Sequence, residues 1–398
     1  MSGHRFEVRV RARRRLAVVA SIVVTLIVAS ATTAVADAKP SRGHRPSADD
    51  ALARAVRDIT TLPGGPVGIV AVVQRGDDLR TFTGGVAQRG TDRAIALDDH
   101  MRLASVAKAF SGAAAVALVA DGRLRLDDTI GRWRPDLPRK WWGITVRQLL
   151  GHTSGIADFS KEPAFQAAVR ANLLSPPPPR DLLTFVAGKH LEFRPGSRYR
   201  YSNSDNIVVG LIVEAVTHRS YADALQSLVY APADLDATSL PRDEVLPSPF
   251  VHGYQPDPPN PPEDVSEILA AGWAWASGGI VSTPRDANRF VRAYVSGRLT
   301  DPRTKAQQFR FRPGSSEPPG PGVNFAGLAV FRYVTRCGVV YGHTGNTAGY
   351  TQFVAATRNG SRSVVVSVNG QITPSSDAAT FARLRHVYEL ATCAALRG

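Results

Sequence analysis

The sequence predicts an α/β fold in which one layer is built from both ends of the chain and an α-helical lobe is inserted between them. Strand-like segments lie near both ends, whereas the middle of the chain is mostly helical in pattern. We expect one large unit over residues 49–398, with the α/β layer at about 49–125 and 275–398 and the helical lobe at about 126–274. A composition that is 43% hydrophobic and 21% charged supplies enough apolar side chains for such a core.

The first predicted strands precede an unusually apolar helix. Residues 67–73 read as a buried strand, and the turn signal at residues 75–78 leads into a second strand at about 80–86. Residues 107–120 are almost wholly apolar after Lys108, and Asp121-Gly122 supplies a stop signal. A helix without a polar face belongs in the core, so we expect residues 107–120 to form a buried helix.

The middle and C-terminal parts are assigned from periodicity and turn residues. Short helical patterns alternate with proline-rich loops in the middle, and the last part returns to strands before a closing helix. Asn359-Gly360 is a strong hairpin signal between two of these strands. The predicted segments are helices at 148–150, 181–187 and 207–216, loops at 176–179, 257–262 and 313–322, strands at 327–334, 338–341, 350–357 and 363–368, and a helix at 377–396.

The first 36 residues have the pattern of a secretory signal peptide. Six arginines lie between residues 5 and 15, residues 16–36 carry no charge, and Ala34-Val35-Ala36 fits a small-residue cleavage site. We therefore expect a secreted, extracellular protein with a linker at residues 37–48. The uncharged stretch of 21 residues is also long enough to span a bilayer, so an uncleaved membrane anchor is the alternative.

The chain is basic, with a formal net charge of +14. The first 36 residues hold six Arg and one Glu, which leaves a charge of about +9 for the remainder. Such a protein can associate with anionic cell-wall polymers or membrane surfaces, although a compositional bias without any partner explains the charge equally well. We expect no nucleic-acid partner, because the arginines are scattered and no nucleic-acid-binding motif accompanies them.

Ser105 and Lys108 form a Ser-x-x-Lys pattern at the start of the predicted buried helix. Residues three apart share a helix face, so the two side chains can meet. Burial lowers the pKa of a lysine, which makes Lys108 a candidate proton acceptor for a nucleophilic Ser105. Only six of the 48 basic residues are lysines, and arginine cannot act as a base. An N-capping serine followed by a surface lysine is the alternative for this pattern by itself.

Two later triplets add polar side chains of the kinds that such a serine would need. Tyr201-Ser202-Asn203 precedes an apolar helix that opens near Asp205. A phenol can relay a proton and a carboxamide can hydrogen-bond a substrate amide. The alternative is that Asn203 or Ser204 merely caps the helix. His343-Thr344-Gly345 ends a predicted strand whose edge could pair with an extended peptide, and a plain turn is the alternative there.

The two cysteines predict one disulfide. Cys337 precedes the His343 triplet and Cys393 lies in the closing helix, so in an exported chain they would tie strand to helix. Two buried free thiols are the alternative. The nine histidines show no metal-binding spacing, and we expect neither a metal nor a cofactor.

In the order Ser-x-x-Lys, Tyr-x-Asn, His-Thr-Gly, the motifs resemble those of the class C β-lactamase and D-alanyl-D-alanine carboxypeptidase family, and most of all the secreted carboxypeptidases of actinomycetes. The resemblance covers roughly residues 50–396 and includes the stretches 149–155, 278–286 and 341–350. It implies a serine β-lactamase/penicillin-binding fold, in which an antiparallel sheet is flanked by helices and carries an inserted all-α lobe. The Cys337/Cys393 pair is also similar to a disulfide in those carboxypeptidases.

The resemblance implies a role for each matching residue. Ser105 would be the nucleophile and Lys108 its proton partner, while Tyr201 would pass a proton to the leaving group and later activate water. The other implied residues bind substrate: Asn203 contacts the acyl amide, Thr344 contacts the terminal carboxylate, and His343 and Gly345 complete the strand triplet. The backbone N–H groups of Asn346 and Ser105 form the implied oxyanion hole. Trp273 and Phe165 line the implied cleft, although Phe165 equally suits the core.

Two positions depart from the family pattern. The third motif begins with His343, as in the carboxypeptidases, where class C β-lactamases have lysine. Because histidine titrates near neutral pH, we expect His343 to make activity pH-dependent. The carboxypeptidases also bind the substrate carboxylate through an arginine upstream of His-Thr-Gly. Arg332 is nearby, but a one-residue offset along a strand would turn it to the opposite face.

The resemblance therefore implies a monomeric serine D-Ala-D-Ala carboxypeptidase that acts on peptidoglycan stem peptides and is inhibited by β-lactam antibiotics. An esterase, D-amino-acid amidase or β-lactamase that uses the same serine is the alternative, because one core can serve several reactions. A catalytically silent domain that binds the cell wall is a third interpretation, and the presence of Ser105, Lys108 and Tyr201 disfavours it.

Overall fold

An antiparallel sheet built from both ends of the chain lies at the centre of the fold. The computed structural model describes residues 47–257, 260–315 and 318–398, which belong to one unit, Pro46–Gly398. Seven strands pair in the order β2-β1-β11-β10-β9-β8-β7. They are β1 (Gly68–Arg75), β2 (Asp78–Gly85), β7 (Val323–Ala326), β8 (Phe331–Thr335), β9 (Gly338–Thr347), β10 (Tyr350–Ala356) and β11 (Arg362–Val368). The predicted layer is thus confirmed, with β1 from the first part beside β11 from the last.

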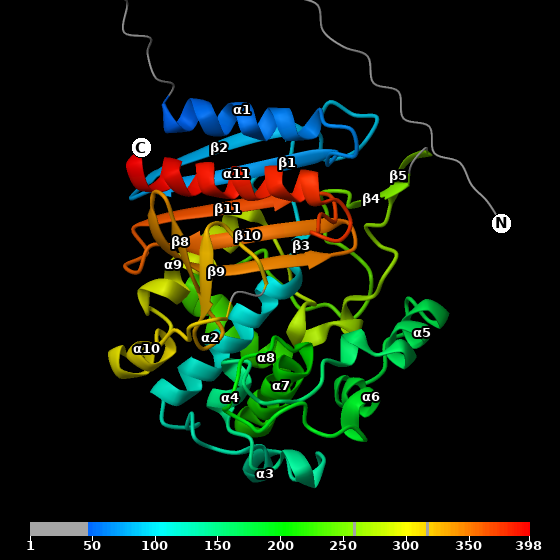
Figure 1. Ribbon diagram of the computed structural model, residues 1–398, viewed down its shortest axis with the longest axis vertical. Helices are drawn as coiled ribbons and strands as arrows, with labels where there is room; N and C mark the ends of the chain where they lie inside the picture. The colour runs from blue at the N-terminus through cyan, green and yellow to red at the C-terminus, as the bar shows by residue number, and fades with distance from the viewer. Residues whose placement is uncertain (1–46, 258–259, 316–317) are drawn as a thin grey trace, which may run out of the picture. The chain divides into compact units, whose positions relative to one another are not determined.

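The sheet is covered on both faces because its central strands are apolar on both. Val364, Val366 and Phe353 pack with α1 (Ala48–Thr60) and α11 (Ala378–Arg397) on one face. Val354 and Val365 point to the other face, towards α2 (Ala107–Ala120) and α9 (Pro284–Ser296). Figure 1 shows α1 and α11 alongside the sheet and the helical lobe on the other side of it. Strands buried on both faces explain the continuous apolar runs in the sequence.

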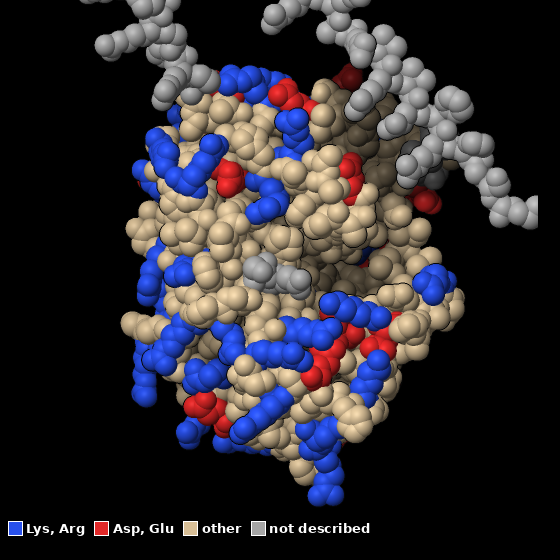
Figure 2. Space-filling view, in the orientation of Figure 1, with Lys and Arg blue, Asp and Glu red and all other residues tan. Residues whose placement is uncertain are grey.

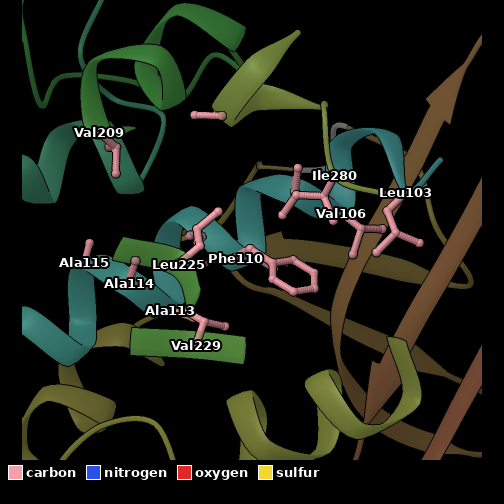
Figure 3. Close-up of a cluster of buried hydrophobic side chains, with 14 of the residues drawn as sticks. Leu103, Val106, Phe110, Ala113, Ala114, Ala115, Val209, Leu225, Val229 and Ile280 are labelled. Carbon is pink, nitrogen blue, oxygen red and sulfur yellow. The ribbon is translucent and has the colours of Figure 1, made fainter. Parts of the chain in front are cut away.

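Helix α2 has the predicted bounds and is the core of the molecule. Its side chains from Ala107 to Val116 are all buried, and Phe110 stacks on Phe290 of α9. Figure 3 shows α2 side chains among those of α7 and of the segment around Val229. The other helices are α3 (Ile130–Trp133), α4 (Val146–Leu150), α5 (Pro163–Ala171), α6 (Thr184–Ala187), α7 (Asn203–Thr217), α8 (Tyr221–Leu225) and α10 (Pro302–Gln308). Two short strands, β3 (Met101–Arg102) and β6 (Val281–Ser282), pair with each other in a separate sheet.

The structure differs from the sequence predictions in two segments. The expected strand at 327–334 begins only at Phe331, as β8, and β7 lies before the expected range. Residues 327–330 form a turn instead, because the backbone N–H groups of Leu328 and Ala329 donate to the carbonyls of Gln308 and Leu150 and not to a neighbouring strand. The expected loop at 257–262 contributes to a hairpin of β4 (Tyr254–Asp257) and β5 (Asn260–Asp264). Proline is tolerated there because the pair has only two strands, both of them edges.

The predicted disulfide between Cys337 and Cys393 is present and joins the β8–β9 turn to α11. On the chain-entropy account, such a bridge contributes roughly 4 kcal/mol to stability. The predicted signal peptide and most of the predicted linker lie outside the described residues, and within these residues no helix is long and apolar enough to cross a membrane.

We predict that Gly112→Ala destabilises the protein. A Cβ at Gly112 would lie inside van der Waals distance of Ala329 Cβ and Tyr294 Oη. Overpacking of this kind costs about 1–3 kcal/mol, which outweighs the gain in helix propensity of about 1 kcal/mol. Urea unfolding should therefore show a lower free energy of unfolding. Gly188→Ala is the matched control, since nothing lies within 4 Å of its added Cβ. Equal stability of the two variants would contradict the prediction.

Candidate active site

Ser105 lies at the junction between a short 3-10 turn, Ala104–Val106, and α2. Ala104 before it has a φ of 49°, a left-handed conformation that is uncommon for a residue with a side chain. Such conformations persist where the surrounding structure holds them, and they cluster at functional sites. Gly345 of β9 lies against this turn, and any Cβ there would collide with Leu103 O and approach Ser105 N. The first and third sequence motifs therefore meet through a glycine.

Lys108 is buried and reaches Ser105. Its ammonium donates to Ser105 Oγ at 3.0 Å, to Asn203 Oδ1 at 2.7 Å and to Ser277 O at 2.6 Å. Burial lowers the pKa of Lys108 to about 7, against an opposing effect of the Asp158 and Asp205 carboxylates. At neutral pH a large fraction of Lys108 is therefore unprotonated and able to accept the Ser105 proton.

Asn203 is held at both ends of its amide. Its Oδ1 accepts from Lys108, while its Nδ2 donates to both carboxylate oxygens of Asp158, at 3.2 and 3.1 Å, and to Ser160 Oγ at 2.9 Å. Asn203 is also the first residue of α7. The observed contacts of Asn203 thus position Lys108, in addition to any contact that the amide makes with a substrate. Neither Asp158 nor Ser160 was expected from the sequence, although both lie within five residues of the 149–155 stretch.

Tyr201 lies close to Lys108 with its hydroxyl buried. The Lys108 ammonium is 5.0 Å from the centroid of the Tyr201 ring. The Tyr201 hydroxyl has no hydrogen-bond partner of good geometry among the described residues. Burial raises the pKa of Tyr201 far above its ordinary value, and the nearby Ser105 hydroxyl offsets only part of the rise. Tyr201 is therefore an un-ionised phenol at neutral pH, and its buried hydroxyl without a partner calls for an explanation, of which a catalytic role is one.

His343 is neutral, which corrects the expectation that it titrates near neutral pH. Its side chain is 1% exposed, and its Nδ1 lies 2.5 Å from the Thr344 carbonyl oxygen. Burial, with the positive charge of Lys108, lowers the pKa of His343 to about 3. Nδ1 donates to the carbonyl, so Nε2 is an acceptor, and it has no partner in the described part of the chain.

A second buried histidine supports Tyr201 from the helical lobe. The His152 and Tyr201 rings have centroids 4.5 Å apart, and His152 Nδ1 lies 2.9 Å from Asp205 Oδ2. Burial lowers the pKa of His152 to about 3 and raises the pKa of Asp205. The contact with Asp205 holds His152 against the Tyr201 segment, and a neutral His152 adds no positive charge beside Lys108 at neutral pH.

Strand β9 offers a free edge beside Ser105. Its ladder with β8 ends where Phe331 opposes Gly342, so among the described strands residues 343–347 pair with β10 alone, on their other side. Thr344, Gly345 and Asn346 line the cleft at this edge. Extended substrates can add to such an edge through main-chain hydrogen bonds. The Asn346 side chain is anchored by Thr351, Ile372 and Gln371.

Two cavities open on either side of Ser105. The first, here called the aromatic pocket, has a volume of about 260 Å³. Its lining is mostly apolar, and it also includes Ser105 and the polar or charged side chains of Asn203, Asn346 and Arg102; the large apolar lining residues are Phe159, Phe165, Val169, Val265, Leu269 and Trp273. Phe165 and Trp273 pack edge to face with ring centroids 5.6 Å apart. Both residues therefore line the cleft as expected, and Phe165 serves the core as well.

The second cavity, here called the proline-lined pocket, has a volume of about 190 Å³. Ser105, Tyr201, Thr344 and Asn346 form its inner end. Arg332 lines neither cavity, since its guanidinium lies over the rings of Phe311 and Phe325. Side-chain alternation along the strand predicts the same orientation for Arg332. Among the described residues, no group of three or more His, Cys, Asp and Glu side chains could hold a metal ion.

Comparison with known proteins relates this geometry to one family. The family model described as Beta-lactamase matches residues 52–389. The chain is 25% identical to penicillin-binding protein 4* of Bacillus subtilis, over 61% of this chain and 55% of that protein. It is 36% identical to the esterase EstB of Burkholderia gladioli, over 42% of this chain and 45% of the esterase. It thus spans about half the length of these curated relatives.

A solved structure covers more of the chain. A D-stereospecific amidohydrolase from Streptomyces sp. is 30% identical and superposes with a TM-score of 0.73, over 85% of this chain and 98% of the amidohydrolase. The fold expected from the motifs is therefore confirmed, whereas these relatives differ among themselves in the substrates that their names give.

We predict that the rate of acylation of Ser105 rises with pH through about 7. Below its pKa Lys108 is protonated and cannot accept a proton, so the rate should fall about tenfold per pH unit there and level off above. The measurement is the rate of labelling by an uncharged fluorophosphonate from about pH 5 to about pH 9. Lys108→Arg should lower the rate by about 100-fold or more and remove the inflection. A flat profile in the unmodified protein would show that Lys108 is not the base.

We predict that His343 does not contribute to this inflection. Its pKa of about 3 keeps the imidazole neutral across the range in which Lys108 titrates. His343→Gln, which retains a donor and an acceptor without a titratable group, should keep the midpoint of the pH profile near 7 even if the maximal rate falls. Loss of the inflection in His343→Gln would restore the sequence-based expectation that His343 titrates.

Proposed function

Since the chain belongs to the Beta-lactamase family of serine hydrolases, we propose that it cleaves an amide or ester bond through an acyl-enzyme on Ser105. The observation that carries this proposal is the 3.0 Å contact between the Ser105 hydroxyl and Lys108, whose pKa burial lowers to about 7. A serine with an adjacent, partly unprotonated base is an activated nucleophile.

In the acylation step, unprotonated Lys108 takes the Ser105 proton as Oγ attacks the substrate carbonyl carbon. The negative charge on the carbonyl oxygen is stabilised by the backbone N–H groups of Ser105 and Asn346. Tyr201 gives its proton to the leaving nitrogen or oxygen as the carbonyl bond to that atom breaks, and regains a proton from Lys108. Water then attacks the ester along the reverse proton path, which releases the acid and restores Ser105.

The acyl part of the substrate occupies the aromatic pocket. Asn203 and Asn346 at its inner end supply polar groups, and the surrounding rings suit an apolar side chain of a D-residue. The D-configuration is supported by the D-stereospecific amidohydrolase, which is similar over most of the chain. This observation favours an amidase or esterase that acts on D-amino-acid derivatives.

A D-Ala-D-Ala carboxypeptidase that acts on peptidoglycan stem peptides is the second candidate. It is supported by the free edge of β9, by Thr344 at that edge and by the similarity to penicillin-binding protein 4*. β-Lactam antibiotics would then acylate Ser105 and act as inhibitors. The two candidates share the acylation chemistry and differ in the leaving group.

We propose that the protein acts outside the cytoplasm, released by cleavage after Ala36 or held by an uncleaved anchor. The disulfide between Cys337 and Cys393 supports an oxidising compartment. Positive charge supports association with anionic cell-wall polymers, and Figure 2 shows Lys and Arg outnumbering acidic residues on the face over α4 and α10.

The proposal predicts a covalent adduct on Ser105. Intact-mass spectrometry after incubation with benzylpenicillin or a fluorophosphonate should show a single addition in the unmodified protein and none in Ser105→Ala. A lasting penicillin adduct favours the carboxypeptidase, whereas a fluorophosphonate adduct without a penicillin adduct favours the amidase or esterase. Absence of both adducts in folded protein would refute the proposed function.

A further inference from the structure

The two cavities beside Ser105 divide the substrate at its scissile bond. Tyr201 and Thr344 line the proline-lined pocket but not the aromatic pocket, whereas Asn203 and Trp273 line only the aromatic pocket. Ser105 lines both. Because Tyr201 delivers the proton to the leaving atom, the leaving group occupies the proline-lined pocket once the acyl group is in the aromatic pocket.

The proline-lined pocket is apolar towards its outer end. Beyond the catalytic residues, it is formed by Pro318, Pro319, Ile372, Pro374, Phe381 and Tyr388. The remaining lining groups are uncharged hydroxyls and amides, so no Asp, Glu, Lys, Arg or His side chain lines this pocket in the described part of the chain. Its volume of about 190 Å³ is enough for one aromatic ring, since a dry cavity of about 150 Å³ can bind benzene.

The cationic side chains around the two cavities have other partners. Arg102, which lines the aromatic pocket, donates to the carbonyls of Ser266 and Glu244. Arg385 of α11 donates to the carbonyls of Gly320 and Gly322. Arg332 lies between the rings of Phe311 and Phe325, and Lys108 is buried against its three acceptors. A leaving group with a free carboxylate would therefore lose water in an apolar pocket without gaining a cationic partner, which is unfavourable.

We propose that the proline-lined pocket selects an uncharged, apolar leaving group, so that this enzyme prefers esters and amides of apolar alcohols and amines over peptides that end in a free carboxylate. This inference rests on the proposed acylation of Ser105 and names the substrate class of the same site. It favours the amidase or esterase over the carboxypeptidase.

The test compares two substrates that differ only in the charge of the leaving group. N-acetyl-D-phenylalanyl-D-alanine ends in a carboxylate, and N-acetyl-D-phenylalanyl-D-alaninamide does not. We expect kcat/KM to be about tenfold or more higher for the amide, a ratio that corresponds to about 1.4 kcal/mol. Ser105 labelling by the fluorophosphonate is measured on the same sample. The inference is overturned if labelled protein shows equal kcat/KM values for the two substrates, a higher kcat/KM for the carboxylate, or cleavage of neither substrate. Absence of labelling would instead overturn the proposed function.

A gain of charge in the pocket provides a second, independent test. Phe381→Arg places a guanidinium at the apolar end of the pocket and should shift the ratio of the two kcat/KM values about tenfold towards the carboxylate substrate. Phe381→Leu is the matched control, because it removes the ring without adding charge and should keep the preference for the neutral substrate. An unchanged ratio in Phe381→Arg, with Ser105 still labelled, would contradict the proposed role of the pocket.

Discussion

The burial of one ammonium group, that of Lys108, is the constraint on which the rest of this structure depends. A lysine inside an apolar helix must find acceptors, and Lys108 has three. Ser105 is one turn away, whereas Asn203 at the start of α7 and the Ser277 carbonyl come from distant parts of the chain. The same burial lowers the pKa of Lys108 to about 7, so the arrangement that satisfies the group also makes it a base.

The charge of Lys108 explains the character of its neighbours. His152 and His343 both have pKa values of about 3, so neither adds a positive charge in the range where Lys108 titrates. Asp158 acts on Lys108 through the Asn203 amide, whose Nδ2 it holds. A carboxylate in direct contact with Lys108 would stabilise the ammonium and raise its pKa, which would leave less of the unprotonated base at neutral pH. With the Asn203 amide between them, Asp158 still orients Lys108 but raises its pKa less.

The site also needs the sheet to be closed by both ends of the chain. β9 reaches Ser105 only because β11 pairs with β1, which places the C-terminal strands beside the segment that leads into α2. Gly345 then permits backbone contact between β9 and the Ser105 turn. With the strand edge fixed there, the two cavities meet at Ser105 and Asn346, which line both of them.

The sequence by itself determined the elements whose signals are local. The apolar run of α2, the spacing of Ser105 and Lys108, the hairpin at Asn359-Gly360 and the Cys337/Cys393 pair all follow from short patterns and agree with the structure. Only the tertiary structure decided that His343 is neutral, that Asp158 holds Asn203, and that a turn replaces the first part of the strand expected at 327–334. The reason is physical: protonation, strand breaks and pocket chemistry depend on desolvation and on partners from remote segments, which the local sequence does not contain.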